Sequence, residues 1–162
     1  MGHIRESVDV DAPVETCWAL QADAARFPDW NTTVIEVKDI SGPIDRVGAS
    51  FTIVSKVLGR RIEATNEVTR VEPMKLFEFR GSGAGGARGD FRTEFEPRGT
   101  GTRVTTQIDY DLPGGWFGDI ADKLFGERQL ERDVKHSSEH FKALAERAAK
   151  VREVTAGGSG ST

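Results

Sequence analysis

The chain has 162 residues, which is enough for one domain with a sizeable core and leaves little room for a second. Hydrophobic residues make up 37% and charged residues 30%, which is the balance of an ordinary folded domain. A net charge of -4 argues against a dedicated nucleic-acid-binding protein, which needs a clustered basic face to neutralise phosphates. No run of about 18 or more apolar residues occurs, and the N-terminus lacks the apolar stretch of a signal peptide, so no integral membrane segment is predicted. The single cysteine, Cys17, forms no internal disulfide, and we expect a cytoplasmic protein.

The opening of the chain predicts one strand followed by two short helices. Residues 4–10 alternate between apolar and polar side chains, which is typical of a strand. Asp11 then offers a capping carboxylate, and Pro13 stands near the expected helix start. The first helix is expected over residues 14–20 and the second over residues 23–29, with Pro28 near its end.

From residue 32 the hydrophobic period changes to two, which indicates strands. Glycine- and proline-rich turns separate the strands, and such short links favour antiparallel hairpins. The expected strands cover residues 32–40, 48–57, 60–72, 75–82, 88–96 and 102–112. In the last two strands the alternation predicts that one face of the sheet is apolar and the other is exposed to solvent.

A helical pattern follows the last strand, from Trp116 to about Val151. Gly126 divides its apolar stripe, so the pattern predicts either one kinked helix or a pair of helices. The domain is therefore expected to span residues 1–152, and residues 153–162 are expected to form a flexible glycine- and serine-rich tail.

A curved sheet wrapped on one long helix leaves a gap, because the curvatures of the two elements differ. A dry cavity of about 300 Å³ would cost about 7 kcal/mol. Since that is comparable to the whole stability of a typical domain, about 5–15 kcal/mol, we expect the gap to be packed, hydrated or occupied by an apolar ligand.

Five segments of the chain form a recognisable series: Val10–Trp18, Arg26–Asn31, Val68–Pro73, Gly101–Thr105 and Leu112–Gly115. In this order, along about residues 4–148, they resemble the START-like (SRPBCC) superfamily, and its polyketide cyclase/dehydrase branch most of all. The resemblance implies an α+β helix-grip fold: a seven-stranded curved antiparallel sheet, two short helices after the first strand, and a long C-terminal helix that encloses a cavity. Members of the superfamily include carriers, cyclases and aromatases, co-chaperones and plant hormone receptors, so the fold does not determine the function.

Two motifs suggest a bound nucleotide or metal, and neither is supported by its surroundings. Residues 81–86 satisfy the pattern GxGxxG, but a strand follows them where a dinucleotide site needs a helix. His136 and His140 have a spacing that suits zinc, but a third ligand is only arguable and the charged residues around them indicate a solvated helix face. We therefore predict no cofactor and no metal site.

The candidate site residues are those that strand parity and helix period direct toward the cavity. Glu6, Asn66 and Tyr110 are weak candidates for catalysis. A hydrogen-bonded or rim-exposed carboxylate is the simpler interpretation of Glu6, and a core tyrosine with a satisfied hydroxyl is that of Tyr110. Asn66 is the best candidate for a hydrogen bond that gives specificity. The residues expected to bind a ligand are Trp30, Phe51, Ile53, Asn66, Phe77, Phe79, Phe91, Thr93, Phe95, Thr106, Ile108, Tyr110, Trp116, Ile120, Leu124, Val134 and Phe141.

Two functions fit this sequence. The first is the binding of a small hydrophobic molecule, such as a lipid, a polyketide or another apolar metabolite, by a carrier or sensor-like protein. The alternative is a polyketide cyclase, aromatase or dehydratase that uses acid-base groups in the same cavity. A protein-binding module without a ligand is a weaker third reading, and the sequence leaves the oligomeric state open.

Overall fold

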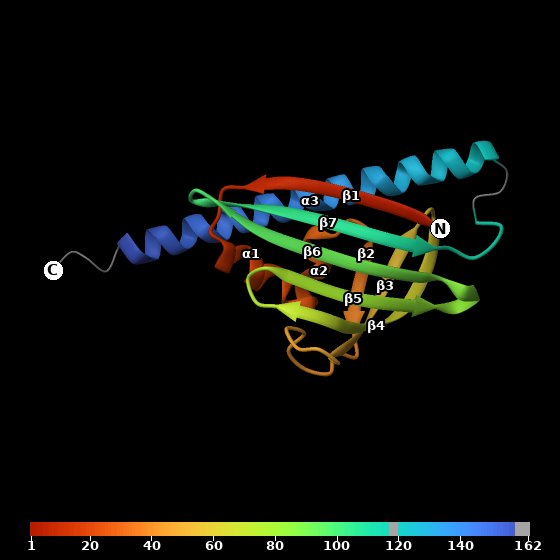
Figure 1. The fold of residues 1–162 in the computed structure, drawn as a ribbon, viewed down its shortest axis with the longest axis horizontal. Helices are drawn as coiled ribbons and strands as arrows, with labels where there is room; N and C mark the ends of the chain where they lie inside the picture. Colours follow the sequence, from red (N-terminus) through yellow and green to blue (C-terminus); the bar gives the residue numbers. More distant parts are fainter. Residues whose placement is uncertain (117–119, 158–162) are drawn as a thin grey trace.

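The computed structural model describes residues 1–116 and 120–157 (Figure 1). The elements follow one another as β1 (Gly2–Val10), α1 (Val14–Gln21), η1 (Ala24–Arg26), α2 (Phe27–Trp30), β2 (Val34–Lys38), β3 (Ser50–Val57), β4 (Arg60–Glu72), β5 (Leu76–Gly83), η2 (Ala84–Gly86), β6 (Arg88–Arg98), β7 (Gly101–Asp111) and α3 (Ile120–Gly157).

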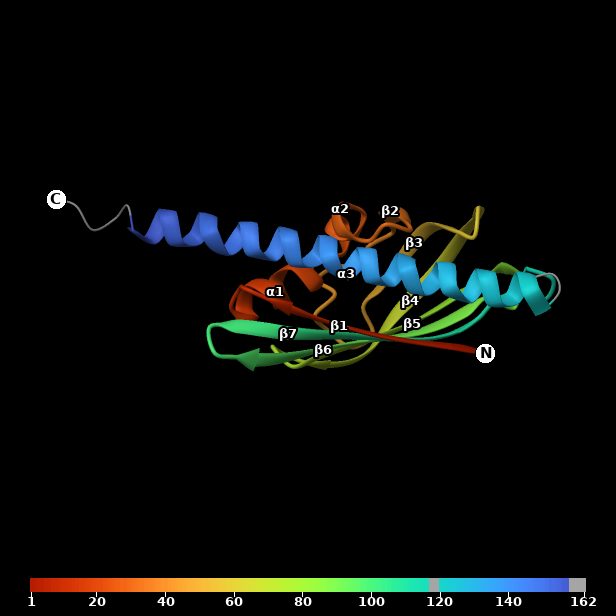
Figure 2. The same cartoon turned by 90° about the horizontal axis from the view of Figure 1, so that it is seen from above.

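The strands form one seven-stranded sheet in the order β1-β7-β6-β5-β4-β3-β2. Every neighbouring pair is antiparallel, and β1 pairs with β7 along its whole length. Figures 1 and 2 show α3 lying across the open side of the curled sheet, with α1 and α2 beside it. The helix-grip arrangement expected from the sequence is confirmed.

The opening helices differ from the prediction in how they begin. Pro13 occupies the N-cap position of α1, and no side chain caps that helix. Asp11 instead donates its backbone N–H to the Glu146 carboxylate of α3, at 2.9 Å. The predicted second helix is divided into η1 and α2, because Pro28 has no backbone N–H to continue a helix and fits only its first turn.

The C-terminal helix is a single element of 38 residues that runs through Gly126 without a break. A glycine costs only about 1 kcal/mol relative to alanine, which the packing of the later part of the helix, from Leu130 to Ala149, outweighs. Trp116 precedes the helix in a turn, where its N–H bonds to the Pro113 carbonyl oxygen at 3.2 Å. The helix also continues past the predicted domain end at residue 152, and residues 158–162 of the predicted tail lie outside the described residues.

Aromatic side chains fill the core where α1 meets the sheet. The Trp18 ring packs edge-on against the rings of Phe95 and Phe77, at centroid distances of 5.4 and 6.2 Å. Beside it Cys17 is fully buried, and this burial raises the pKa of its thiol to about 11. The thiol is therefore protonated and unreactive at neutral pH.

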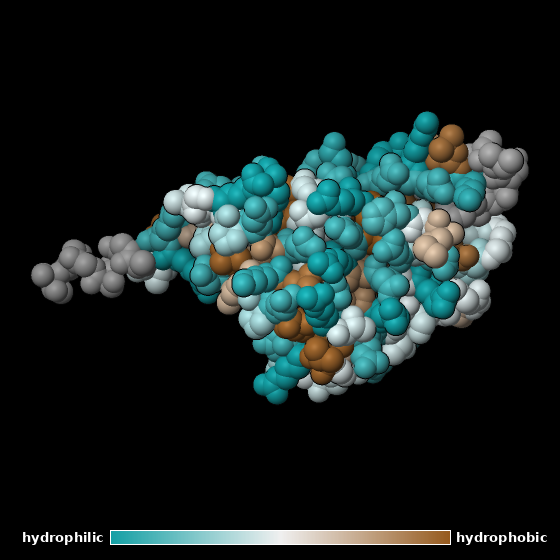
Figure 3. Space-filling model, viewed as in Figure 1, coloured by the Kyte–Doolittle hydropathy of each residue, from teal (hydrophilic) through white to brown (hydrophobic). Residues whose placement is uncertain are grey.

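Charged side chains cover the outer face of the sheet. Arg103 of β7 forms two hydrogen bonds to Asp9 of β1, at 2.8 and 3.2 Å. Arg80 of β5 bonds to Asp90 of β6 at 2.6 Å. Figure 3 shows a mostly hydrophilic surface on the side of the molecule seen in Figure 1. Among the described residues, none of the helices combines the length and the apolar character that a membrane span requires.

The hairpin between β3 and β4 turns through Leu58 and Gly59, both of which have positive φ angles, 51° and 77°. This combination is the signature of a type I′ turn, which favours Asn-Gly. A leucine in the left-handed region costs about 1–2 kcal/mol, and asparagine tolerates that region better.

We therefore expect Leu58→Asn to raise the free energy of unfolding by about 1 kcal/mol, measured by urea denaturation. Gly59→Ala is the matched control and should lower it by a similar amount, because alanine is strained at this φ. Equal stability of the wild type and both variants would show that the turn conformation is not the one described.

Candidate ligand cavity

Five residues of the inner sheet face have small side chains or none, and they adjoin one another. The strand register pairs Ala64 of β4 with Gly83 of β5, and Gly81 of β5 with Gly89 of β6. Ala87 stands between η2 and β6, where its backbone bonds to Gly83. We call Ala64, Gly81, Gly83, Ala87 and Gly89 the small-residue patch. Side chains this short cannot span the distance from the sheet to α3, so a space remains above them.

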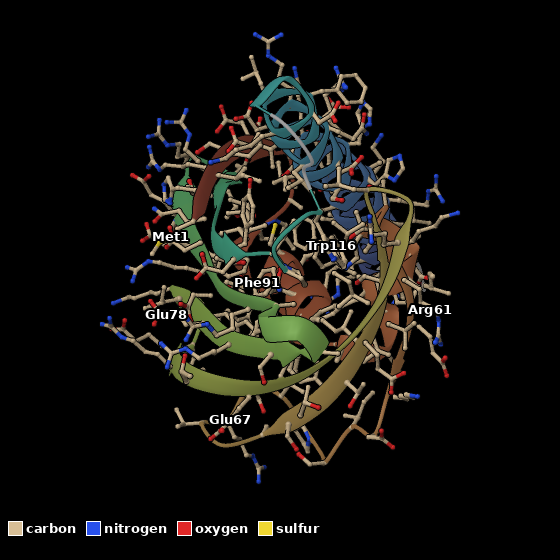
Figure 4. The ribbon with its side chains drawn as sticks, turned by 90° about the vertical axis from the view of Figure 1, so that its right-hand side faces the viewer. Met1, Arg61, Glu67, Glu78, Phe91 and Trp116 are labelled. Atoms are coloured by element: carbon tan, nitrogen blue, oxygen red, sulfur yellow. The ribbon has the colours of Figure 1, made fainter. Side chains whose placement is uncertain are left out.

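The space is a cavity of about 220 Å³. It exceeds the engineered cavity of about 150 Å³ that binds benzene, and it is slightly smaller than drug-sized pockets, which begin at about 300 Å³. Its walls are mainly apolar. Figure 4 views the molecule from the side that lies on the right in Figure 1. Phe91 lies on the inner side of the sheet and Trp116 near the opening of the cavity, while Glu67 and Glu78 lie on the outer side.

Eleven of the predicted ligand-contacting residues line this cavity. Their positions agree with the strand parity and helix period from which they were chosen. They are Trp30, Ile53, Asn66, Phe79, Phe91, Thr93, Thr106, Ile108, Tyr110, Val134 and Phe141.

Three predicted phenylalanines do not line the cavity. Phe51, Phe77 and Phe95 are almost fully buried in the packed core. They point inward as strand parity predicts, but α1 and α2 cover that half of the sheet and fill the space above it. The cavity occupies only the half of the inner face that carries the small-residue patch.

Two predicted residues near the start of α3, Trp116 and Leu124, also lie outside the cavity. Trp116 borders a separate open groove at the mouth, and Leu124 is 50% exposed. Because α3 continues unbroken at about 3.6 residues per turn, Leu124 is rotated about a third of a turn from Leu130, which lines the cavity. The side chain of Ile120 lies outside the described residues.

Glu6 does not contribute to the lining. It is half-buried on β1 between Ile4 and Val8, both of which do line the cavity. Its register partner is Thr106 of β7.

Gln21 is a lining residue that the sequence prediction missed. It ends α1, is 5% exposed, and belongs to the same helix face as Val14, Cys17 and Trp18. The spacing i, i+3, i+4, i+7 was the available signal. It was overlooked because the predicted helix ended one residue earlier, at Leu20.

A polar cluster fixes α3 above the sheet at the edge of the cavity. The backbone N–H of Thr32 donates to the Ser137 hydroxyl of α3 at 3.0 Å, and that hydroxyl donates to the Asp133 carbonyl at 2.8 Å. Asn31 accepts hydrogen bonds from the backbone N–H and the hydroxyl of Thr33, at 3.1 and 2.9 Å. These bonds tie the corner between α2 and β2 to the helix and hold it at a set distance from the small-residue patch.

Tyr110 brings the one phenol of the chain into the cavity wall. Burial raises the pKa of this phenol, and the carboxylates of Glu127 and Glu131 on α3 raise it further. The hydroxyl is therefore protonated at neutral pH, where it acts as a hydrogen-bond donor and not as a base.

A groove at the mouth is bordered by the β3–β4 hairpin, Trp116 and the first turns of α3. The guanidinium of Arg60 lies 5.2 Å from the centroid of the Trp116 ring, a cation–π contact between the hairpin and the segment that precedes α3. Asp133 borders both this groove and the cavity, so the two spaces adjoin.

The two motifs that suggested a nucleotide or a metal lead to no such site in the described structure. The glycine-rich segment forms the end of β5, the short η2 turn and the start of β6, with no helix N-terminus to face a pyrophosphate. His136 and His140 are exposed on α3. Within residues 1–116 and 120–157, no three His, Cys, Asp or Glu side chains are grouped closely enough to hold a metal ion.

The family model described as polyketide cyclase / dehydrase and lipid transport matches residues 1–146. The chain belongs to this family. A search of curated protein sequences gives no significant match. The START-like relationship expected from the sequence is thereby confirmed.

Solved structures share the fold at low sequence identity. TTHA0849 from Thermus thermophilus is 20% identical with a TM-score of 0.75, and the match covers 91% of this chain and 99% of that one. The Zhui aromatase/cyclase from Streptomyces is 16% identical with a TM-score of 0.67, covering 90% and 94% of the two chains. A START superfamily protein from Mycobacterium smegmatis is 15% identical with a TM-score of 0.64, covering 91% and 97%.

Filling the cavity tests its geometry. Ala64→Leu adds three carbon atoms above the small-residue patch, and we expect the free energy of unfolding to rise by about 2 kcal/mol in urea denaturation. Thr65→Leu is the matched control: its side chain is exposed, so the added carbons should leave stability nearly unchanged. A strong destabilisation by Ala64→Leu would show that the space is already packed.

Proposed function

We propose that the protein binds a small hydrophobic molecule in the cavity, as a carrier or a sensor. The observation that carries the proposal is a cavity of about 220 Å³ with mainly apolar walls in the interior of a small domain. Left dry and empty, it would cost about 5 kcal/mol, a large part of the typical stability of about 5–15 kcal/mol. A bound apolar molecule offsets that cost, so the fold itself favours occupancy.

The chemistry of the walls favours binding over turnover. Asn66 and Gln21 carry amides, which do not ionise, and the Tyr110 hydroxyl stays protonated at neutral pH. Two charged residues also line the cavity, and both have protein partners: Asp133 accepts a hydrogen bond from Gln129 on its Oδ1 at 2.9 Å, and Arg88 bonds to Asp111 at 3.5 Å. Most polar groups of the wall are therefore amides, hydroxyls or a guanidinium, which are poor general bases at neutral pH.

A polyketide cyclase or dehydratase is the second candidate. The description of the family supports it, as does the fold shared with the Zhui aromatase/cyclase. The Tyr110 hydroxyl would then donate a hydrogen bond that polarises a substrate carbonyl, and the Asn66 oxygen would orient a substrate hydroxyl. The buried free thiol of Cys17 fits a reducing cytoplasm, where we propose that the protein acts.

Native mass spectrometry of the freshly purified protein tests the binding proposal. We expect a non-covalent adduct of a small hydrophobic molecule on the wild type and on Thr65→Leu, and its loss on Ala64→Leu, whose larger side chain occupies the cavity. The ligand-free protein should bind naphthalene in isothermal titration calorimetry with the same dependence on the two variants.

Two outcomes would change this conclusion. If no adduct is found and naphthalene does not bind, the cavity is not a binding site. If the bound molecule is converted to a product of different mass during incubation, and Tyr110→Phe abolishes the conversion, the protein is an enzyme of the second class.

A further inference from the structure

Asn66 presents an unpaired acceptor to the cavity. Its side chain is 2% exposed, and its amide nitrogen donates to the backbone oxygens of Ala64 and Phe51, at 2.9 and 3.5 Å. Both N–H groups are used, so the orientation of the amide is fixed. The amide oxygen lies over Gly81, where a Cβ atom would collide with it. Within the described part of the chain, no donor reaches this oxygen.

Gln21 and Thr93 add further unpaired polar groups from two other elements. Gln21 of α1 is 5% exposed and Thr93 of β6 is 6% exposed, and both line the cavity. In the described residues, neither side chain has a hydrogen-bond partner. An unpaired buried polar group costs about 1–3 kcal/mol, so the unpaired groups of Asn66, Gln21 and Thr93 along one cavity favour an occupant that supplies their partners.

The chemistry of the missing partner follows from these groups. The Asn66 oxygen accepts only, so the occupant must offer an O–H or N–H group. Among the described residues, no cation near this amide is available to receive an anion, because the one basic lining residue, Arg88, already bonds to Asp111. An isolated carboxylate or phosphate here would be a buried charge without a partner, which is strongly unfavourable.

The adjoining wall suits a flat ring. The rings of Phe79 and Phe91 are stacked, with centroids 4.6 Å apart and planes inclined by 12°. Phe91 leans over Gly89, where a Cβ atom would be 2.8 Å from its ring. Phe79 is the register partner of both Phe91 and Val68, and Gly81 is the partner of Asn66. The two rings therefore lie two residues along the strands from Asn66 and Gly81, on the same face of the sheet.

We propose that Asn66 and Gln21 form a hydrogen-bonding subsite that selects a neutral ligand carrying a hydroxyl or N–H group. The donor bonds to the Asn66 oxygen, the Gln21 amide bonds to the oxygen of the same group or of a second polar substituent, and the ring system lies against Phe79 and Phe91. Hydrocarbons bind without forming these hydrogen bonds, and carboxylates do not bind. This inference rests on the proposed binding function.

Calorimetric titration with five naphthalene-based probes tests the subsite. Naphthalene has no polar group, methoxynaphthalene has an acceptor alone, naphthol has one donor, dihydroxynaphthalene has two donors, and naphthoate carries a negative charge. We expect the wild type to bind naphthol about tenfold more tightly than methoxynaphthalene, and naphthoate not to bind measurably. Equal affinities for naphthol and methoxynaphthalene would mean that water satisfies Asn66, and tighter binding of naphthoate would mean an anion site; either result overturns the proposal.

Two variants locate the effect. Asn66→Leu removes the acceptor and should reduce the preference for naphthol over methoxynaphthalene to about twofold or less. Gln21→Leu removes the amide and shortens the side chain by one atom, and it should weaken the binding of naphthol and dihydroxynaphthalene, but not of naphthalene. Gln107→Leu, at a position that parity places on the outer sheet face, is the matched control and should change none of these affinities. A preference for naphthol that survives both cavity variants would contradict the proposal.

This experiment distinguishes a failure of the proposed binding function from a failure of the proposed subsite. If none of the probes binds, the proposed binding function fails. If naphthalene, methoxynaphthalene and naphthol bind equally, the cavity is a binding site without the subsite. The probe comparison on the wild type needs no substitution, so it tests the subsite even if Asn66→Leu does not fold.

Discussion

The small-residue patch is the constraint on which the site depends. Five neighbouring positions on the inner face of the central strands carry a glycine or an alanine, while the other half of that face carries the large rings of the core. One half of the sheet therefore packs against helices, and the other half stands apart from α3. Because four of the five patch residues lie on hydrogen-bonded strands, and Ala87 is bonded to Gly83 through its backbone, the space above the patch is a rigid feature of the fold. Gly81 also makes room for the Asn66 oxygen, so the same glycines create the cavity and admit its polar group.

Hydrogen bonds hold α3 to the rest of the domain at two places along its length. Near the cavity, Ser137 is bonded to the backbone of Thr32. Farther along, Lys142 donates to the Asp9 carbonyl at 2.7 Å, and Glu146 accepts the N–H of Asp11. The hydrogen bonds from Lys142 and Asp11 lower the pKa of the Glu146 carboxyl, which stays ionised at neutral pH. With both attachments made, the helix cannot settle onto the patch, and the cavity persists between two fixed surfaces.

Much of this architecture could be predicted from the sequence, because period and turn chemistry are local signals. The strand parity of residues 91–95 and 104–112 assigned the inner face correctly, and the family resemblance supplied the topology. The extent of the cavity could not be predicted in this way. Whether Phe77 meets a helix or an empty space depends on where α1 lies, and whether Leu124 faces the sheet depends on the helix continuing through Gly126. The small-residue patch itself was visible as a glycine-rich segment, but only the register between β4, β5 and β6 brings its members together.

A crystal structure of the ligand-free protein under xenon pressure tests the central claim most directly, because xenon enters apolar cavities and reports the space itself. The account predicts xenon density between α3 and the small-residue patch, next to Phe91 and Ile108, with the side chains of the wall unmoved. A crystal in which α3 rests on the patch, or in which neighbouring side chains fill the space and exclude xenon, would contradict it.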